Sequence, residues 1–139
     1  MRYWLLKSEP SSWSWQDQQA RGDAGEGWDG VRNHQASKNM KAMAIGDLAF
    51  FYHSIKEKQI VGIVEIIKLY HPDPTDRSGR YGMVTVKAVK NMVKYVTLTD
   101  IKADERLRDM ALVRQARLSV TPVSQSQWQI ILEKGATRL

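Results

Sequence analysis

Apolar, aromatic and β-branched residues gather in six short segments of the chain, the composition typical of β-strands. The pattern predicts strands at residues 3–6, 48–54, 60–67, 81–89, 95–98 and 117–120. Residues 60–67 are apolar on both faces, which favours a central place in a sheet. Gly62 inside this run predicts a bulge or a close approach by another group.

Alternation along the strands predicts which side chains share a face. Within 48–54, period two groups Phe51 with His53 on one face and Phe50, Tyr52 and Ser54 on the other. Within 81–89 it places Val84, Val86 and Ala88 together. Each strand should therefore present two different faces.

Helix-capping patterns mark the segments between and after the strands. Ser14 to Asp17 resembles a capping box and predicts a helix to about Ala20, and Ser124 to Gln127 predicts a last helix. That last helix would bury Trp128, Ile131 and Leu132 and stop at Gly135. Further helical segments are expected at 35–43, with Met40 and Met43 on one edge, after a cap at Thr99, and at 107–113. Residues 21–27 and 71–80 are predicted loops.

The order of these elements indicates the fold class. Strands and helices do not alternate as they do in βαβ units, and Pro10 and Pro122 are expected to end strands. We therefore predict an α+β fold: a small twisted, partly closed β-barrel of five or six strands with short peripheral helices. A length of 139 residues suits one domain spanning 1–139.

The charge of the chain indicates a class of partner. The net charge is +6, of which +1 falls on residues 1–70 and +5 on 71–139, and such a surplus favours an acidic partner such as nucleic acid. The absence of cysteine excludes disulfides and thiolate metal sites and fits a reducing compartment. The apolar N-terminal stretch is too short for a signal peptide, so we expect a cytoplasmic protein, or a nuclear one in a eukaryote, and not a secreted one.

The stretch from Trp28 to Ala36 holds the most suggestive chemistry. An indole, a carboxylate, a flexible glycine, a guanidinium and an amide occur within six residues, a composition that suits a binding lip. A structural interpretation is open beside it, in which Trp28 fills the core and Asn33 caps a helix. Spacing alone does not decide between the two.

Signals for catalysis and metal binding are weak. The three histidines, His34, His53 and His71, have no metal-ligand spacing, and no nucleophile elbow occurs. Glu9 and His53 could form an acid/base pair only if the fold brings them together. We therefore expect no catalytic residue, no metal and no cofactor.

Five blocks of residues together resemble the EVE-domain family. They are Trp-Leu-x-Lys-Ser-Glu-Pro (4–10), Trp-Asp-Gly-Val-Arg-Asn (28–33), Gly-Asp (46–47), Phe-Phe-Tyr-His-Ser (50–54), and Val-x-Leu (96–98) with Arg-Leu-Ser-Val-x-Pro (117–122). The resemblance implies a PUA-like fold related to the YTH domains, which hold a methylated adenine in an aromatic cage. EVE domains are thought to read modified bases, notably modified cytosines, in DNA or RNA.

The resemblance also implies a set of site residues. Those nominated for a base pocket are Lys7, Ser8, Glu9, Trp28, Val31, Asn33, Phe51, Tyr52, His53 and Ser54. Cations nominated for phosphate contacts are Arg32, Lys87, Lys90, Lys94 and Arg117. Several positions depart from the family pattern, which leaves the identity of the base open: Trp13, His34, Ser37, Tyr81 and Thr85.

These residues predict a non-catalytic reader that stacks an extruded base on Trp28 and reads its polar edge with Asn33. Two alternatives remain open. One is an enzyme that acts on modified nucleotides or nucleic acid, with Glu9 or His53 as acid or base. The other is an interaction module whose slot accepts a small molecule or a peptide.

Overall fold

A computed structural model describes all residues from 1 to 139, and its centre is one mixed sheet of six strands. The strands are β1 (Tyr3–Ser8), β2 (Glu26–Gly27), β3 (Leu48–His53), β4 (Gln59–Pro72), β5 (Gly82–Thr97) and β6 (Val120–Val123). Their order across the sheet is β2-β5-β4-β3-β1-β6. β1 and β3 are parallel, and every other neighbouring pair is antiparallel.

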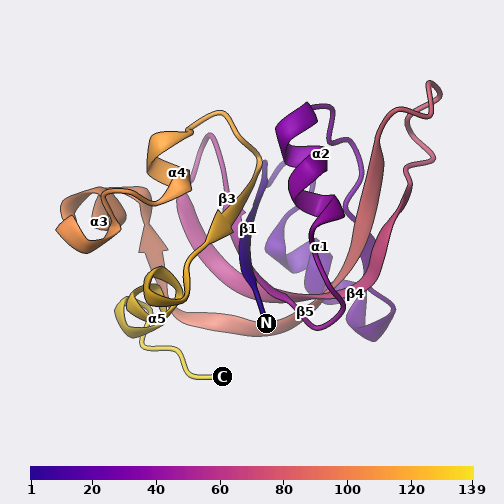
Figure 1. Ribbon diagram of the computed structural model, residues 1–139. Coiled ribbons are helices and arrows are strands. Elements are labelled where there is room, and N and C mark those ends of the chain that lie inside the picture. The colour runs from indigo at the N-terminus through magenta and orange to yellow at the C-terminus, as the bar shows by residue number, and fades with distance from the viewer.

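Five short helices flank the sheet on both sides (Figure 1). They are α1 (Trp15–Ala20), α2 (His34–Lys41), α3 (Leu98–Ala103), α4 (Ala111–Arg114) and α5 (Gln125–Lys134), with single 3₁₀ turns at Gly22–Ala24 and Glu105–Leu107. Figure 1 shows α1 and α2 on one side of the long curved strands β4 and β5, and α3, α4 and α5 on the other. None of these helices is both long and apolar enough to cross a membrane.

The fold class is α+β, as the sequence predicts, but the sheet is not a closed barrel. Its end strands β2 and β6 do not pair with each other. Instead, α2 packs against β4, β5 and β6 across the bent sheet. The bend has a visible cause, because β4 and β5 change register at several bulges along their length.

Alternation along the strands produces two separate cores, one on each face of the sheet. Leu6 and Phe51 face α1 and α2, and their core includes Trp15 and Met40. Leu5, Phe50 and Tyr52 face the other way, into a core that Trp128 of α5 closes. The rings of Trp128 and Phe50 are stacked, with their centroids 4.0 Å apart. The predicted faces of 48–54 and 81–89 are confirmed.

Gly62 lies where the indole of Trp15 meets the sheet. A Cβ at this position would stand 2.3 Å from ring atoms of Trp15. The register of β3 against β4 also shifts next to its partner Phe51. Both parts of the prediction for Gly62, a close approach and an irregular ladder, are therefore confirmed.

Local capping signals identify two helices correctly and misplace a third. Ser14 and Ser124 begin α1 and α5 with complete capping boxes. α3 is capped by Thr97, not Thr99, because β5 runs without a break to Thr97 through the predicted gap after residue 89. Pro122 does not end a strand either: it lies inside β6, an edge strand that pairs only with β1, so a missing N–H is tolerated.

Candidate functional site

A hollow of about 360 Å³ opens beside the loop that joins β1 to α1. Three chain segments form its wall: the end of β1 with the following loop, β2, and the first residues of the predicted lip. The lining residues are Lys7, Ser8, Glu9, Ser12, Trp13, Glu26, Gly27, Trp28 and Asp29. Two tryptophans thus meet several charged and polar residues in one concave place.

Trp28 belongs to both the core and the hollow. Its side chain packs edge-on against Phe51, with ring centroids 5.5 Å apart, and only 7% of the residue is exposed. Its backbone N–H donates to the carbonyl of Val84 on β5 at 2.7 Å. Trp28 therefore fills the core, as the structural interpretation expects, and it is also one of the residues that line the hollow.

Trp13 provides a second indole, held by polar contacts at both ends. Its Nε1–H donates to Oε1 of Gln18 at 2.9 Å, and its carbonyl accepts a short hydrogen bond from the Ser8 hydroxyl. Gln18 in turn donates to the carbonyl of Val86 on β5. The Trp13 ring is thus positioned by the start of α1 and by β5 together.

Lys7 and Glu9 place opposite charges on the wall. The Lys7 ammonium donates to the carbonyl of Ala116 at 2.8 Å, and burial lowers its pKa. Oε2 of Glu9 accepts from the hydroxyl and the backbone N–H of Ser11, and these hydrogen bonds lower the pKa of Glu9. Its other oxygen, Oε1, is covered and has no hydrogen-bond partner.

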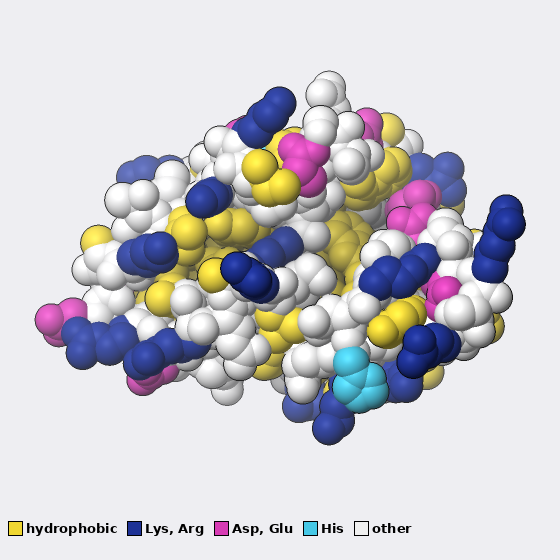
Figure 2. Space-filling view, turned by 90° about the horizontal axis from the view of Figure 1, so that it is seen from above, with side chains coloured by type: hydrophobic (Ala, Val, Ile, Leu, Met, Phe, Trp, Pro, Cys, Tyr) yellow, Lys and Arg dark blue, Asp and Glu magenta, His cyan; other side chains and the backbone are white.

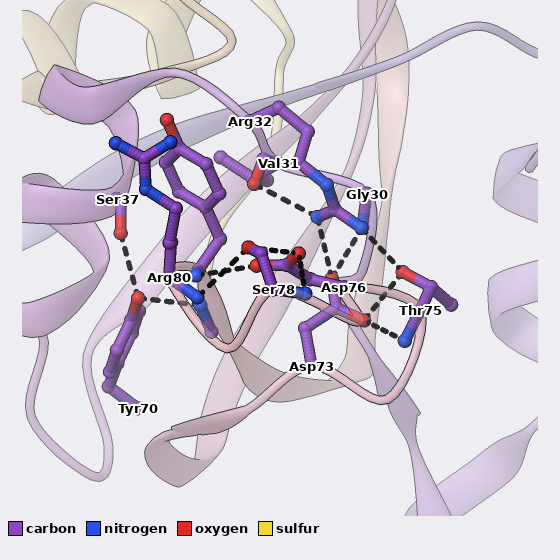
Figure 3. Close-up of polar contacts among 12 residues, drawn as sticks. Gly30, Val31, Arg32, Ser37, Tyr70, Asp73, Thr75, Asp76, Ser78 and Arg80 are labelled. Carbon is purple, nitrogen blue, oxygen red and sulfur yellow. Dashed lines mark hydrogen bonds and ion pairs between the residues drawn. The ribbon is translucent and has the colours of Figure 1, made fainter.

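The lip is fastened to the loop between β4 and β5 by Asp73 (Figure 3). Oδ2 of Asp73 accepts from the N–H of Gly30 at 2.9 Å and from Nη1 of Arg32 at 3.0 Å, and Oδ1 accepts twice from Thr75. Burial alone would raise the pKa of Asp73, but the hydrogen bonds from Thr75, Gly30 and Arg32 outweigh it and lower the pKa to about 2. An ionised, buried carboxylate thus fixes the lip.

Four of the ten nominated pocket residues line the hollow: Lys7, Ser8, Glu9 and Trp28. Phe51 lies directly behind Trp28 in the core, and Val31 is buried in the same core. Ser54 approaches only through its backbone, whose N–H donates to the carbonyl of Ser8. These three residues support the hollow without lining it.

The remaining three nominated residues have other roles. Asn33 is exposed and caps α2, with its Oδ1 accepting from Ala36 N–H at 2.9 Å. Tyr52 points into the opposite core, where burial raises its pKa to about 12. Nε2 of His53 accepts from the backbone N–H of Trp15 at 3.0 Å. Asn33 and Tyr52 therefore do not line the hollow.

The nominated cations lie in several places. Arg32 is engaged by Asp73 and Thr75, Lys90 donates to the carbonyl of Arg138, and Lys87 lies 3.9 Å from Asp23. Lys94 lines a different hollow with Asp104 and Lys134. Arg117 is exposed and follows Ala116, the residue that Lys7 contacts. Figure 2 shows Lys and Arg side chains spread over the face seen from above, not one compact basic patch.

Sequence reasoning missed five residues of the wall: Ser12, Trp13, Glu26, Gly27 and Asp29. Asp29 belongs to the stretch 28–33 and Trp13 is an aromatic three residues after Pro10, so both carried a usable signal. Glu26 and Gly27 looked like part of a mobile loop. They are ordered because β2 pairs with β5.

Comparisons with known proteins identify the family of this chain. The model of the EVE domain matches residues 2–134. The chain belongs to the EVE domain family. Thymocyte nuclear protein 1 of Rattus norvegicus is 35% identical over 94% of this chain and 72% of its own length.

Solved structures of similar sequence share the fold of this EVE domain. A protein from Agrobacterium tumefaciens is 46% identical, with 99% of this chain and 94% of that chain covered and a TM-score of 0.95. The human THYN1 protein, solved in complex with DNA containing 5-methylcytosine, is 30% identical, with both chains covered completely and a TM-score of 0.90.

The expected likeness to YTH domains is confirmed at the level of the fold. The YTH domain of the Zygosaccharomyces rouxii MRB1 protein, solved with N6-methyladenosine RNA, gives a TM-score of 0.58 at 17% identity. The aligned parts cover 96% of this chain and 86% of that chain. At so low an identity, the comparison shows a similar fold and says nothing about the ligand of this EVE domain.

Proposed function

We propose that this EVE domain is a non-catalytic reader of nucleic acid that accepts a modified cytosine in the hollow between Trp13 and Trp28. The observation that carries the proposal is the meeting of these two indoles with Lys7, Ser8 and Glu9 in one concave site. The human THYN1 chain that this domain matches from end to end was solved with DNA containing 5-methylcytosine, which supports the choice of base.

The energetics of base extrusion agree with such a site. Removing a base from its stack costs a few kcal/mol, and stacking on an aromatic side chain returns about 1–3 kcal/mol. A methyl group adds only about 0.8 kcal/mol. The polar wall and phosphate contacts must therefore supply the remaining affinity, and selectivity for the methyl group alone should be modest.

Binding, not catalysis, fits the state of the two candidate acid/base groups. The lowered pKa of Glu9 makes it a poor proton donor at neutral pH. Nε2 of His53 is occupied by the N–H of Trp15. Because His53 does not line the hollow, the two groups do not form an acid/base pair there.

The test is an equilibrium titration, followed by fluorescence anisotropy, of labelled oligonucleotides that carry one 5-methylcytosine or one cytosine, single-stranded and double-stranded. Trp13→Ala should weaken binding of the methylated oligonucleotide at least about tenfold, because a stacking surface is lost. Trp28→Ala should do the same wherever circular dichroism shows that the variant remains folded.

Tyr95→Ala serves as the matched control. Tyr95 is an exposed aromatic residue on β5 that does not line the hollow. Its removal should leave the affinity unchanged. Wild-type affinity in Trp13→Ala would refute the proposed binding site, and no binding of any oligonucleotide by the wild type would refute the reader function itself.

A further inference from the structure

The hollow is acidic although the protein is basic. Three carboxylates, those of Glu9, Glu26 and Asp29, line it together with the single ammonium of Lys7, in a chain of net charge +6. Glu26 is paired with Arg21 at 3.2 Å, whereas Glu9 and Asp29 form no ion pair. Such a wall repels a phosphate and attracts a group that donates hydrogen bonds.

Glu9, a residue of this wall, has one carboxylate oxygen without a hydrogen-bond partner. Oε2 accepts two hydrogen bonds from Ser11, while Oε1 receives no donor and is shielded from water. Leaving a charged oxygen without a partner costs stability, and the cost is removed when a donor arrives. The last torsion of a glutamate side chain is soft, so a small rotation can turn an oxygen toward an occupant of the hollow.

We propose that Glu9 accepts a hydrogen bond from the exocyclic amino group of the bound base, so that the hollow selects amino-bearing bases over bases with a carbonyl in that place. This inference rests on the proposed function and names the feature of the base that is read. Glu9 would then be the residue that determines specificity, a role that the sequence-based hypothesis gave to Asn33.

The chemistry of the bases explains the selection. Cytosine presents an N4 amino donor where thymine presents the O4 acceptor. A carboxylate can only accept, so it pairs with the amino group and repels the carbonyl oxygen. Lys7 complements this preference, because its ammonium has three donors, of which Ala116 uses one, and can donate to the unprotonated ring nitrogen beside the amino group.

The decisive comparison is between 5-methylcytosine and thymine at the same position of one single-stranded oligonucleotide. Both bases carry the same methyl group, and a single strand removes any contribution from base pairing. The wild type should bind the 5-methylcytosine oligonucleotide at least about tenfold more tightly. Glu9→Gln should reduce the preference to less than about threefold, because the glutamine amide can both donate and accept.

Glu105→Gln is the matched control. Glu105 is an exposed carboxylate in the 3₁₀ turn after α3, outside the hollow, and its substitution should leave the preference unchanged. Equal binding of the two oligonucleotides by the wild type, or an undiminished preference in folded Glu9→Gln, would overturn the role of Glu9.

The two proposals fail in different ways. If both oligonucleotides bind equally and Trp13→Ala weakens both, the reader function stands and the amino-group reading is lost. If the wild type binds neither, the proposed function is lost as well. Should Glu9→Gln not fold, the wild-type comparison alone still decides whether the amino group is read.

Discussion

At the scale of single residues, aromatic side chains connect the core to the hollow. Trp28 touches Phe51, Phe51 touches Trp15, and the ring of Trp15 covers Gly62 in the neighbouring strand. Each ring is positioned by the one behind it, so the shape of the wall depends on packing several residues away. Adding or removing one methyl group within this row should therefore change the stability of the protein.

Gly62→Ala should lower the stability by about 1–3 kcal/mol, the usual cost of overpacking a core. The new Cβ would stand 2.3 Å from ring atoms of Trp15, so the indole or the strand must move. Urea-induced unfolding of the wild type and the variant measures the loss directly.

The double variant Gly62→Ala with Trp15→Phe tests the cause. A smaller ring leaves room for the methyl group, so the double variant should lose less stability than the sum of the two single losses. Strictly additive losses would show that the cost of alanine does not come from Trp15.

Residue-level prediction from the sequence succeeded where local rules apply. The alternation along 48–54 separated Phe51 from Tyr52 correctly, and it could also have removed Tyr52 from the nominated pocket. Sequence left two interpretations of Asn33 open, because an amide at a lip and an amide at a helix N-cap look alike. Only the contact with Ala36 distinguishes the two roles.

At the scale of elements, the lip depends on the loop that follows β4. Asp73 connects the two through the N–H of Gly30 and the guanidinium of Arg32 (Figure 3). Its side chain is fully buried, and the lip has no other ion pair to this loop. Trp28 comes just before these two residues, so its position should depend on whether Asp73 is ionised.

The Asp73 connection should make stability depend on pH. The folded pKa of Asp73 is about 2, below its ordinary value of 3.8, so its contribution is present above about pH 4 and is lost as the pH falls from about 4 to 2. In urea unfolding experiments, Asp73→Asn should be less stable than the wild type at pH 6, and the difference should shrink at pH 2.5.

Asp23→Asn is the control for this titration, because the side chain of Asp23 is almost fully exposed. Its stability should follow that of the wild type at both pH values. A gap between wild type and Asp73→Asn that stays constant from pH 6 to 2.5 would contradict the assignment.

Elements with local signals were predictable, whereas strand ends set by distant pairing were not. Ser14 and Ser124 cap helices through residues three positions away, and both were found. The extents of β5 and β6 depend on partners in β4 and β1, which no local pattern reveals. The same limit explains why β2 was taken for a loop.

At the scale of the whole molecule, the charge is arranged in two ways that suit the proposed function. A net charge of +6 would attract the phosphates of a nucleic acid, while the acidic hollow would accept the base. Lys and Arg side chains are dispersed over the face in Figure 2, so phosphate attraction should come from several separate contacts.

Affinity for a single-stranded oligonucleotide should therefore fall steeply with salt, by about 0.7 in the logarithmic slope for each phosphate contact. Arg117→Ala should reduce the magnitude of that slope by the amount for about one phosphate contact. Arg117 is exposed and adjoins Ala116, the residue that Lys7 contacts. Anisotropy titrations at salt concentrations from about 50 to about 300 mM, a range over which the Debye length shortens, measure the slope.

Lys102→Ala provides the comparison. Lys102 is exposed on α3, at the opposite end of the molecule from α1 and α2 (Figure 1), so the slope should not change. Identical slopes for the wild type and Arg117→Ala would remove Arg117 from the phosphate contacts. Salt-independent binding by the wild type would instead favour a small-molecule or peptide ligand.

The pairing of β1 with β6 has a consequence for biosynthesis. β1 is synthesised well before β6, residues 120–123, which is one of its two neighbours in the sheet. A nascent chain on the ribosome thus carries the apolar segment Trp4–Leu6 with an open ladder edge until β6 has been synthesised, a state prone to aggregation. Stalled or shortened translation products should for that reason need chaperones more than the finished protein does.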